Sequence, residues 1–192
     1  MQALERPPAP ELMGPVEGSA TLRDGERVTI RRVRPEHASL LGRFLAGLSE
    51  TTISRRFFAS VRPEKVLDGI LQNAADPTNV SLVMFVGDGP DRRVIAQAEY
   101  FRDGPTAPGA EAAFLVADAY QGHGCATLLL ERLARGAVRD GISRLHAVVM
   151  SENYQMVEVF RLCGLREEEQ WGTDALHITL HLSEPESSSS AA

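Results

Sequence analysis

The chain has few cysteines, no excess of basic residues and no long apolar run, and these absences exclude several classes of protein. It contains two cysteines and one tryptophan, and its net charge at pH 7 is −6. No apolar run approaches the ~20 residues that a membrane-spanning helix needs. Without an excess of basic residues, the chain has no overall electrostatic footprint for nucleic acid. We therefore expect neither a membrane segment nor a nucleic-acid partner.

The two cysteines, Cys125 and Cys163, each lie inside an apolar pattern of helical spacing. We interpret them as small buried hydrophobic side chains rather than as disulfide partners, and no cluster of metal-ligating residues surrounds them. The N-terminal stretch is rich in proline and lacks the apolar core of a signal peptide. We expect a cytoplasmic protein without a metal.

A length of 192 residues, with 43% hydrophobic and 24% charged residues, is ordinary for one soluble domain. Four prolines among the first 15 residues predict a mobile N-terminal arm over residues 1–22. A run of serines predicts a disordered tail over residues 184–192. The folded domain is expected between these segments, over residues 23–183.

Hydrophobic periodicity predicts an order of helices and strands. Strands are expected at residues 28–34, 80–86, 94–100, 111–116 and 145–150, with one or two more between 168 and 181. Helices are expected at residues 35–48, 49–58, 63–74 and 122–139, with a short one after Asn153. The helix at 122–139 would connect two parallel strands. The predicted fold is α/β (α+β), a mixed and mostly antiparallel sheet with helices on both faces.

A glycine-bearing turn joins the strand at 111–116 to the helix at 122–139. Gly122 and Gly124 can adopt positive φ and allow a ligand to approach the backbone. The free N–H groups and the dipole of the following helix suit a phosphate or pyrophosphate. An empty tight turn would have a similar sequence. The turn is neither a P-loop, because no Gly-Lys-Ser/Thr follows, nor a dinucleotide fingerprint, because the third glycine is missing.

The hexapeptide at residues 121–126, Gln-Gly-His-Gly-Cys-Ala, fits the pattern Gln/Arg-x-x-Gly-x-Gly/Ala. It resembles the coenzyme A pyrophosphate loop of the GNAT (Gcn5-related N-acetyltransferase) superfamily, and the resemblance covers about residues 25–182. Residues 30–38 and 48–58 are similar to the acetyltransferase domain of bacterial Pat-type protein lysine acetyltransferases. Those enzymes often carry a regulatory domain, and such control would need a separate partner here.

The resemblance implies acetyl-CoA as co-substrate and assigns parts of its site. Pantetheine would pair with the end of the strand at 111–116, and the pyrophosphate would lie on the glycine turn. Asn153 matches an asparagine that often contacts the cofactor, although a plain helix cap explains it equally well. The implied contacts are Phe114, Leu115, Val116, Gln121, Gly122, His123, Gly124, Cys125, Ala126, Thr127 and Asn153.

Acetyl transfer to an amine needs a base, since only about one lysine amine in a few thousand is neutral at pH 7. Glu111 opens the strand that leads into the loop, and its Ala-Glu-Ala-Ala context is similar to that of the Pat-type general base. A solvated glutamate at a strand edge is the alternative interpretation. Glu99, on the preceding strand, is the second candidate for the base, directly or through water.

Many GNAT enzymes place a tyrosine seven residues after the asparagine, where it protonates the departing thiolate. Phe160 occupies that position here and has no proton to give. Water, Tyr154 or Ser151 could substitute, and no assignment follows. His123 is expected to be a solvated loop residue, and Trp171 is expected to pack against the protein rather than recognise a substrate.

These features favour an acetyl-CoA-dependent N-acetyltransferase with a protein lysine as acceptor, and an acyl-CoA synthetase is the first candidate protein. A small amine is the second acceptor class. A GNAT module that senses acyl-CoA without turnover, or a structural interaction protein with an empty turn, remains open. The sequence does not distinguish a monomer from a homodimer.

Overall fold

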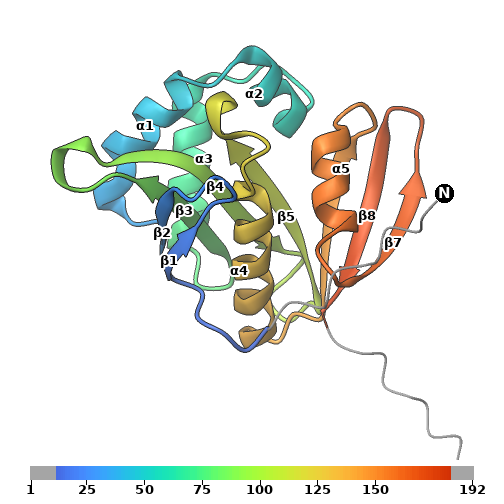
Figure 1. The fold of residues 1–192 in the computed structure, drawn as a ribbon. Coiled ribbons are helices and arrows are strands. Elements are labelled where there is room, and N and C mark those ends of the chain that lie inside the picture. Colours follow the sequence, from blue (N-terminus) through green and yellow to red (C-terminus); the bar gives the residue numbers. More distant parts are fainter. Residues whose placement is uncertain (1–11, 183–192) are drawn as a thin grey trace, which may run out of the picture.

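The structure is a computed structural model that describes residues 12–182, and these form one eight-stranded sheet with helices on both faces (Figure 1). The strand order is β1-β2-β3-β4-β5-β6-β8-β7. Every neighbouring pair is antiparallel except β5 and β6, which are parallel. The predicted fold class and its parallel strand pair are therefore confirmed.

The strands are β1 (Gly18–Thr21), β2 (Arg27–Arg32), β3 (Val80–Val86), β4 (Arg93–Arg102), β5 (Gly109–Val116), β6 (Arg144–Met150), β7 (Arg166–Trp171) and β8 (Ala175–His181). The helices are α1 (Ala38–Ala46), α2 (Glu50–Phe57), α3 (Pro63–Ala75), α4 (Cys125–Arg139) and α5 (Tyr154–Arg161). Short 3₁₀ turns lie at Pro35–His37, Gly89–Asp91 and Asp118–Tyr120. Apart from β1, each of these strands and α-helices matches a predicted segment to within a few residues.

The N-terminal arm predicted over residues 1–22 is too long. Val16 and Leu22 are buried in the main core, and β1 pairs with β2 along its whole length. The carbonyl groups of Gly14 and Pro15 accept hydrogen bonds from Arg139 at 3.0 Å and from Arg135 at 3.2 Å, both on α4. These residues therefore belong to the domain. Residues 1–11 and the predicted tail at 184–192 lie outside the described residues.

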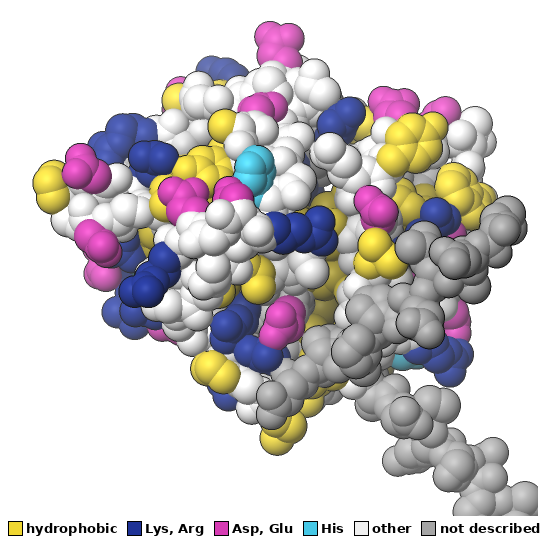
Figure 2. All heavy atoms as spheres, in the orientation of Figure 1, with side chains coloured by type: hydrophobic (Ala, Val, Ile, Leu, Met, Phe, Trp, Pro, Cys, Tyr) yellow, Lys and Arg dark blue, Asp and Glu magenta, His cyan; other side chains and the backbone are white. Residues whose placement is uncertain are grey.

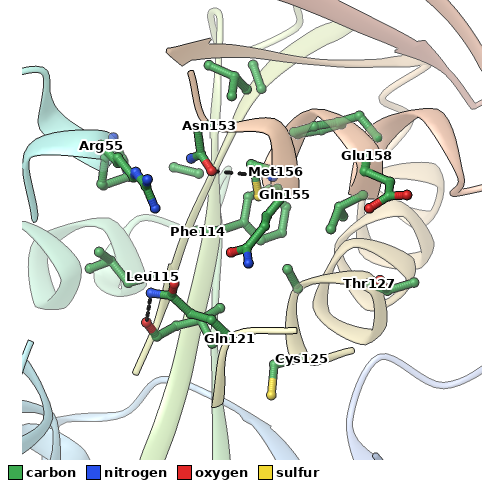
Figure 3. A pocket seen from close by; sticks show the side chains of 18 of the residues that line it. Arg55, Phe114, Leu115, Gln121, Cys125, Thr127, Asn153, Gln155, Met156 and Glu158 are labelled. Atoms are coloured by element: carbon green, nitrogen blue, oxygen red, sulfur yellow. Dashed lines mark hydrogen bonds between the residues drawn. The ribbon is translucent and has the colours of Figure 1, made fainter. Parts of the chain in front are cut away.

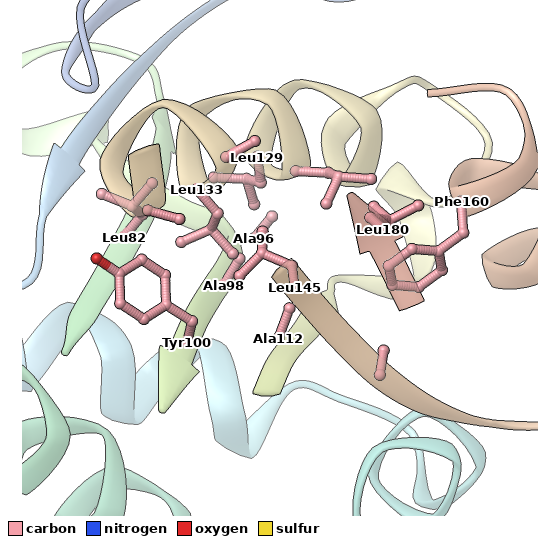
Figure 4. Packing of buried hydrophobic residues seen from close by; sticks show 14 of the residues in the cluster. Leu82, Ala96, Ala98, Tyr100, Ala112, Leu129, Leu133, Leu145, Phe160 and Leu180 are labelled. Carbon is pink, nitrogen blue, oxygen red and sulfur yellow. The ribbon is translucent and has the colours of Figure 1, made fainter. Parts of the chain in front are cut away.

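Two apolar clusters hold helices against the two faces of the sheet. Figure 4 shows the larger one, in which Leu129 and Leu133 of α4 pack on Ala98 and Tyr100 of β4. The smaller cluster joins α1 and α3 to the opposite face. β3 is buried at all seven positions, which explains its continuous apolar sequence. The central strands thus provide a rigid base for the loops at their ends.

Figure 1 shows α5, β7 and β8 on one side of the molecule and α1, α2 and α3 on the other. Cys125 is buried as expected, whereas Cys163 is only partly buried. Trp171 is 59% exposed at the end of edge strand β7, so the expectation that it packs against the protein is wrong. Within residues 12–182, no helix is long and apolar enough to cross a membrane.

Candidate functional site

The parallel strands β5 and β6 pair only over a short distance and then separate. Their register runs from Gly109 with Arg144 to Glu111 with His146, and Glu111 is the last paired position on β5. Beyond it, β5 continues to pair with β4 on its other side. The edge of β5 that faces β6 is therefore open along residues 112–116. An extended chain could pair there as an added strand.

A cavity of about 700 Å³ occupies the space where the two strands part. Its volume lies in the range of small-molecule sites. It is enclosed by β5 and α2 on one side, by β6 and α5 on another, and by the loop before α4 (Figure 3). Figure 2 shows apolar side chains in the depression between α4 and α5. The cavity is thus apolar in its depth and bordered by polar loop atoms.

The structure brings most of the predicted site residues together around this cavity. Glu111 lines it and is half-buried. The predicted cofactor contacts that also line it are Phe114, Leu115, Val116, Gln121, Gly122, Gly124, Cys125, Ala126, Thr127 and Asn153. His123 does not line it, because its ring lies over the loop with Nδ1 2.9 Å from the carbonyl of Gln121 and Nε2 3.7 Å from Asp24.

The glycine turn adopts the backbone that its sequence suggested. Gly122 has φ +80° and Gly124 has φ +92°, a left-handed region that favours glycine. Gly124 caps α4, a helix of 15 residues, so the first N–H groups of α4 lack helical acceptors and open onto the cavity. Burial raises the pKa of the Cys125 thiol to about 11, so this thiol is protonated at neutral pH.

A hydrogen-bond network fastens the loop to α2. The side chain of Gln121 donates to Thr52 Oγ1 at 3.0 Å and to the carbonyl of Val116 at 3.3 Å. Asp118 accepts hydrogen bonds from the backbone N–H of Ser49 at 3.0 Å and from Thr52 Oγ1 at 2.8 Å. Burial raises the pKa of Asp118, but these hydrogen bonds together hold it below its usual value. Gln121 therefore positions the loop through its side chain.

Glu99, the second candidate for the base, is sealed behind the cavity. It is 4% exposed and does not line the cavity. Its carboxylate accepts hydrogen bonds from Asn73 at 3.0 Å and Ser81 at 3.3 Å, and it lies 3.8 Å from Arg56. Burial raises the pKa of Glu99, with Arg56 and the hydrogen bonds opposing that effect. The carboxylate of Glu99 therefore interacts with Arg56 inside the protein and does not face the cavity.

The three positions considered as a proton donor to the departing thiolate, Ser151, Tyr154 and Phe160, are poorly placed for that role. Phe160 is 1% exposed and packs edge-on against Phe114, with ring centroids 5.9 Å apart. Tyr154 is 76% exposed, and neither it nor Ser151 lines the cavity. Asn153 accepts a hydrogen bond from the N–H of Met156 at 3.4 Å, so it caps α5 while its side chain borders the cavity.

Three arginines line the cavity: Arg56, which belongs to the Pat-like segment at residues 48–58, and Arg23 and Arg55, which the sequence did not single out. Arg23 comes from the β1–β2 turn, where its N–H donates to the carbonyl of His123 at 3.2 Å. Its side chain lies over Gly124, with Cγ 3.3 Å from where a Cβ would stand. No local pattern reveals this contact, because about 100 residues separate the two segments.

Comparison with known proteins gives one consistent result. A model of the acetyltransferase (GNAT) family matches residues 50–165. The sequence is 32% identical over 144 residues to Acetyltransferase Pat of Mycolicibacterium smegmatis, a stretch that is 74% of this chain and 42% of that protein. The chain thus spans less than half the length of that curated relative.

Solved structures of similar fold include GNAT proteins, in agreement with the family match. The GNAT domain of PAT from S. lividans superposes with a TM-score of 0.75 at 29% identity, covering 86% of this chain and 97% of that one. A cAMP-binding acyltransferase from Mycobacterium smegmatis gives 0.60 at 25% identity, over 88% and 48% of the two chains. YncA from Salmonella typhimurium, solved with acetyl-CoA, gives 0.63 at 18% identity over 85% and 99%, a likeness of fold alone.

Proposed function

Because this chain belongs to the acetyltransferase (GNAT) family, we propose that it transfers the acetyl group of acetyl-CoA to an amine. One observation carries the proposal beyond family membership. Glu111 stands at the last paired position of β5 and β6, inside the same cavity onto which the N-terminus of α4 opens. A base and an anion-binding helix end thus share one space.

The residues of the cavity fit coenzyme A along its length. Gly122 leaves the backbone open to a pyrophosphate, and the α4 N-terminus and Arg23, whose side chain lies over Gly124, offer positive charge beside it. The open edge of β5 at residues 114–116 suits the pantetheine arm, and Asn153 borders the same space. Acetyl-CoA supplies the activated thioester. The N–H groups at this edge are suited to polarise its carbonyl.

Glu111 is the proposed general base. In the transfer, the amine nitrogen forms a new bond to the acetyl carbon, the carbon–sulfur bond breaks, and the amine proton passes to the carboxylate of Glu111. Positioning the amine contributes several kcal/mol more. Phe160 has no proton to give, so the departing sulfur leaves as a thiolate or takes a proton from water. This is feasible because a thiol has a pKa of about 8.5.

A lysine side chain on a folded protein is the foremost acceptor, with an acyl-CoA synthetase as first candidate. The likeness to Acetyltransferase Pat supports this choice, together with the Pat-type features of residues 30–38 and 48–58. A small amine is the second candidate acceptor. A module that senses acyl-CoA without turnover is favoured only by Phe160.

The test is release of free coenzyme A from acetyl-CoA in the presence of lysine peptides, folded proteins and common small amines. The chain has a single lysine, Lys65 on α3, so a Lys65→Arg variant removes acetylation of the protein's own lysine side chain from the measurement. We expect acceptor-dependent release with at least one protein. Turnover with a polyamine and with no protein would favour the small-amine class. Binding of acetyl-CoA without any turnover would favour the sensing module.

A further inference from the structure

Arg55 is a half-buried arginine of α2 that lines the cavity. Over residues 12–182 the structure gives its guanidinium neither a hydrogen bond nor an ion pair. The adjacent Arg56 differs, since Glu99 lies 3.8 Å from it, and its guanidinium also stacks on the ring of Phe57 at 4.7 Å. The charge of Arg56 is used within the protein, whereas that of Arg55 is available to a ligand.

Arg55 lies away from the end of the cavity that suits phosphate. Figure 3 shows its side chain entering from the α2 side, on the opposite side of the cavity from Thr127 at the start of α4. Arg55 follows Thr52 by one helical turn, on the face that points to β5. Arg56, its neighbour, is close enough to Glu111 to feel its charge. Arg55 therefore flanks the region where the acyl group and the amine meet.

The acidic side chains that line the cavity are Glu111 and Glu158, and neither forms an ion pair with Arg55. Figure 3 places Glu158 on the far side, beyond Met156 and Gln155. A guanidinium that is partly removed from water without an anion is costly, and a bound anion repays this cost. The planar fork of arginine matches a carboxylate in a bidentate geometry.

We propose that Arg55 recognises a carboxylate on one of the two reactants, either on the acyl group or on the molecule that bears the acceptor amine. This inference rests on the proposed acyl transfer and names the chemistry of its substrate. A carboxylate at this position would hold the reactant against the open edge of β5 while its reacting atom lies near Glu111. Arg55 would then determine specificity rather than take part in the transfer.

The experiment measures kcat/KM of the Lys65→Arg protein with two matched pairs of reactants. In the first arm the acyl donor is acetyl-CoA, and the acceptor is N-α-acetyl-lysine, which has a carboxylate, or its neutral amide. In the second arm the acceptor is a lysine peptide without other charges, and the donor is succinyl-CoA or butyryl-CoA, which differ in a terminal carboxylate. Arg55→Gln is compared with Arg62→Gln, a control at an exposed arginine outside the cavity.

We expect a preference for the carboxylate-bearing member in one arm of roughly tenfold to a hundredfold, the range of a charged hydrogen bond. Arg55→Gln removes that preference and leaves kcat/KM of the neutral member within about twofold, while Arg62→Gln keeps the preference. The arm that shows the effect identifies the reactant.

Three results would overturn the assignment: no preference in either arm, a preference that survives Arg55→Gln, or an equal loss with both members of a pair. Acyl transfer without any carboxylate preference would leave the proposed function intact. A wild-type protein that transfers no acyl group to any acceptor overturns both.

Discussion

The hydroxyl of Ser49, at the start of α2, donates a 2.5 Å hydrogen bond to the carboxylate of Asp118 in the loop before α4. The same loop leads to the glycine turn, and α2 carries Arg55 and Arg56. This hydrogen bond is one of several that fasten the two walls of the cavity to each other. The side of the cavity assigned to coenzyme A and the side assigned to the acceptor are mechanically connected through this carboxylate.

Asp118→Ala should therefore loosen both walls. Because Asp118 is exposed, solvent screens its interactions, and we expect a loss of only about 1 kcal/mol of unfolding free energy. Acetyl-CoA affinity should fall as well, since the loop loses its support. Thermal unfolding and calorimetric titration measure the two effects, with Asp68→Ala on the exposed face of α3 as control. Unchanged affinity in Asp118→Ala would contradict the connection.

The pH dependence of this contribution follows from the lowered pKa of Asp118. A carboxyl group whose pKa is lower in the folded state stabilises the fold fully above its unfolded pKa of about 3.9. The contribution disappears as the pH falls through the lower folded value. The difference in unfolding free energy between wild type and Asp118→Ala should stay at about 1 kcal/mol from pH 5 to 8 and should shrink only below about pH 4.

Arg23 should contribute to binding of the coenzyme phosphates. Arg23→Ala is expected to weaken the affinity for acetyl-CoA by roughly tenfold, because a guanidinium beside a phosphate contributes on the order of 1–2 kcal/mol to binding. Arg27→Ala is the control, at an exposed arginine outside the cavity. Titration with coenzyme A and dephospho-coenzyme A distinguishes the phosphates. If Arg23→Ala loses affinity for coenzyme A alone, Arg23 contacts the 3′-phosphate. If it loses affinity for both ligands, Arg23 contacts the pyrophosphate. Unchanged affinity for both ligands refutes the contact.

Gly124→Glu should abolish acetyl-CoA binding, because it puts bulk and negative charge where Arg23 and the phosphates would lie. Any side chain at φ +92° is also strained. Gly141→Ala is a matched control for that strain, since it has φ +73° with nothing within 4 Å and follows the far end of α4. We expect Gly141→Ala to lower the melting temperature slightly and to keep full affinity. Full affinity in Gly124→Glu would show that the ligand lies elsewhere.

Removing residues 1–22 should unfold or strongly destabilise the domain, because it deletes β1 and the buried Val16 and Leu22. Leu22→Ala alone is expected to cost about 2–5 kcal/mol. Removing residues 1–11 is the matched truncation, since it takes away no contact that the structure describes. Circular dichroism and thermal unfolding compare the two. A truncation of residues 1–22 as stable as the full chain would mean that the N-terminal strand is dispensable.

Much of the fold could be predicted because helical and alternating periodicity reports burial on one side of an element. β1 was missed for the opposite reason, since Gly-Ser-Ala-Thr has no apolar alternation and pairs only because β2 offers an edge. Glu99 and Glu111 look alike in sequence, and only packing separates them, with Asn73 and Arg56 enclosing the first. Arg23 and Arg55 act across segments far apart in the chain, and no local pattern contains that information.

Whether Glu111 accepts the amine proton is measured by the kcat of Glu111→Gln at saturating acetyl-CoA. The substitution keeps the size of the side chain and removes its basicity. We expect kcat at pH 7 to fall by a factor on the order of 10²–10⁴, with partial recovery at high pH where free amine is abundant. Acetyl-CoA affinity should barely change, and Glu158→Gln, across the same cavity, should keep its kcat. A wild-type kcat in Glu111→Gln at pH 7 would show that Glu111 is not the base, and a fall in kcat in Glu99→Gln alone would assign that role to Glu99.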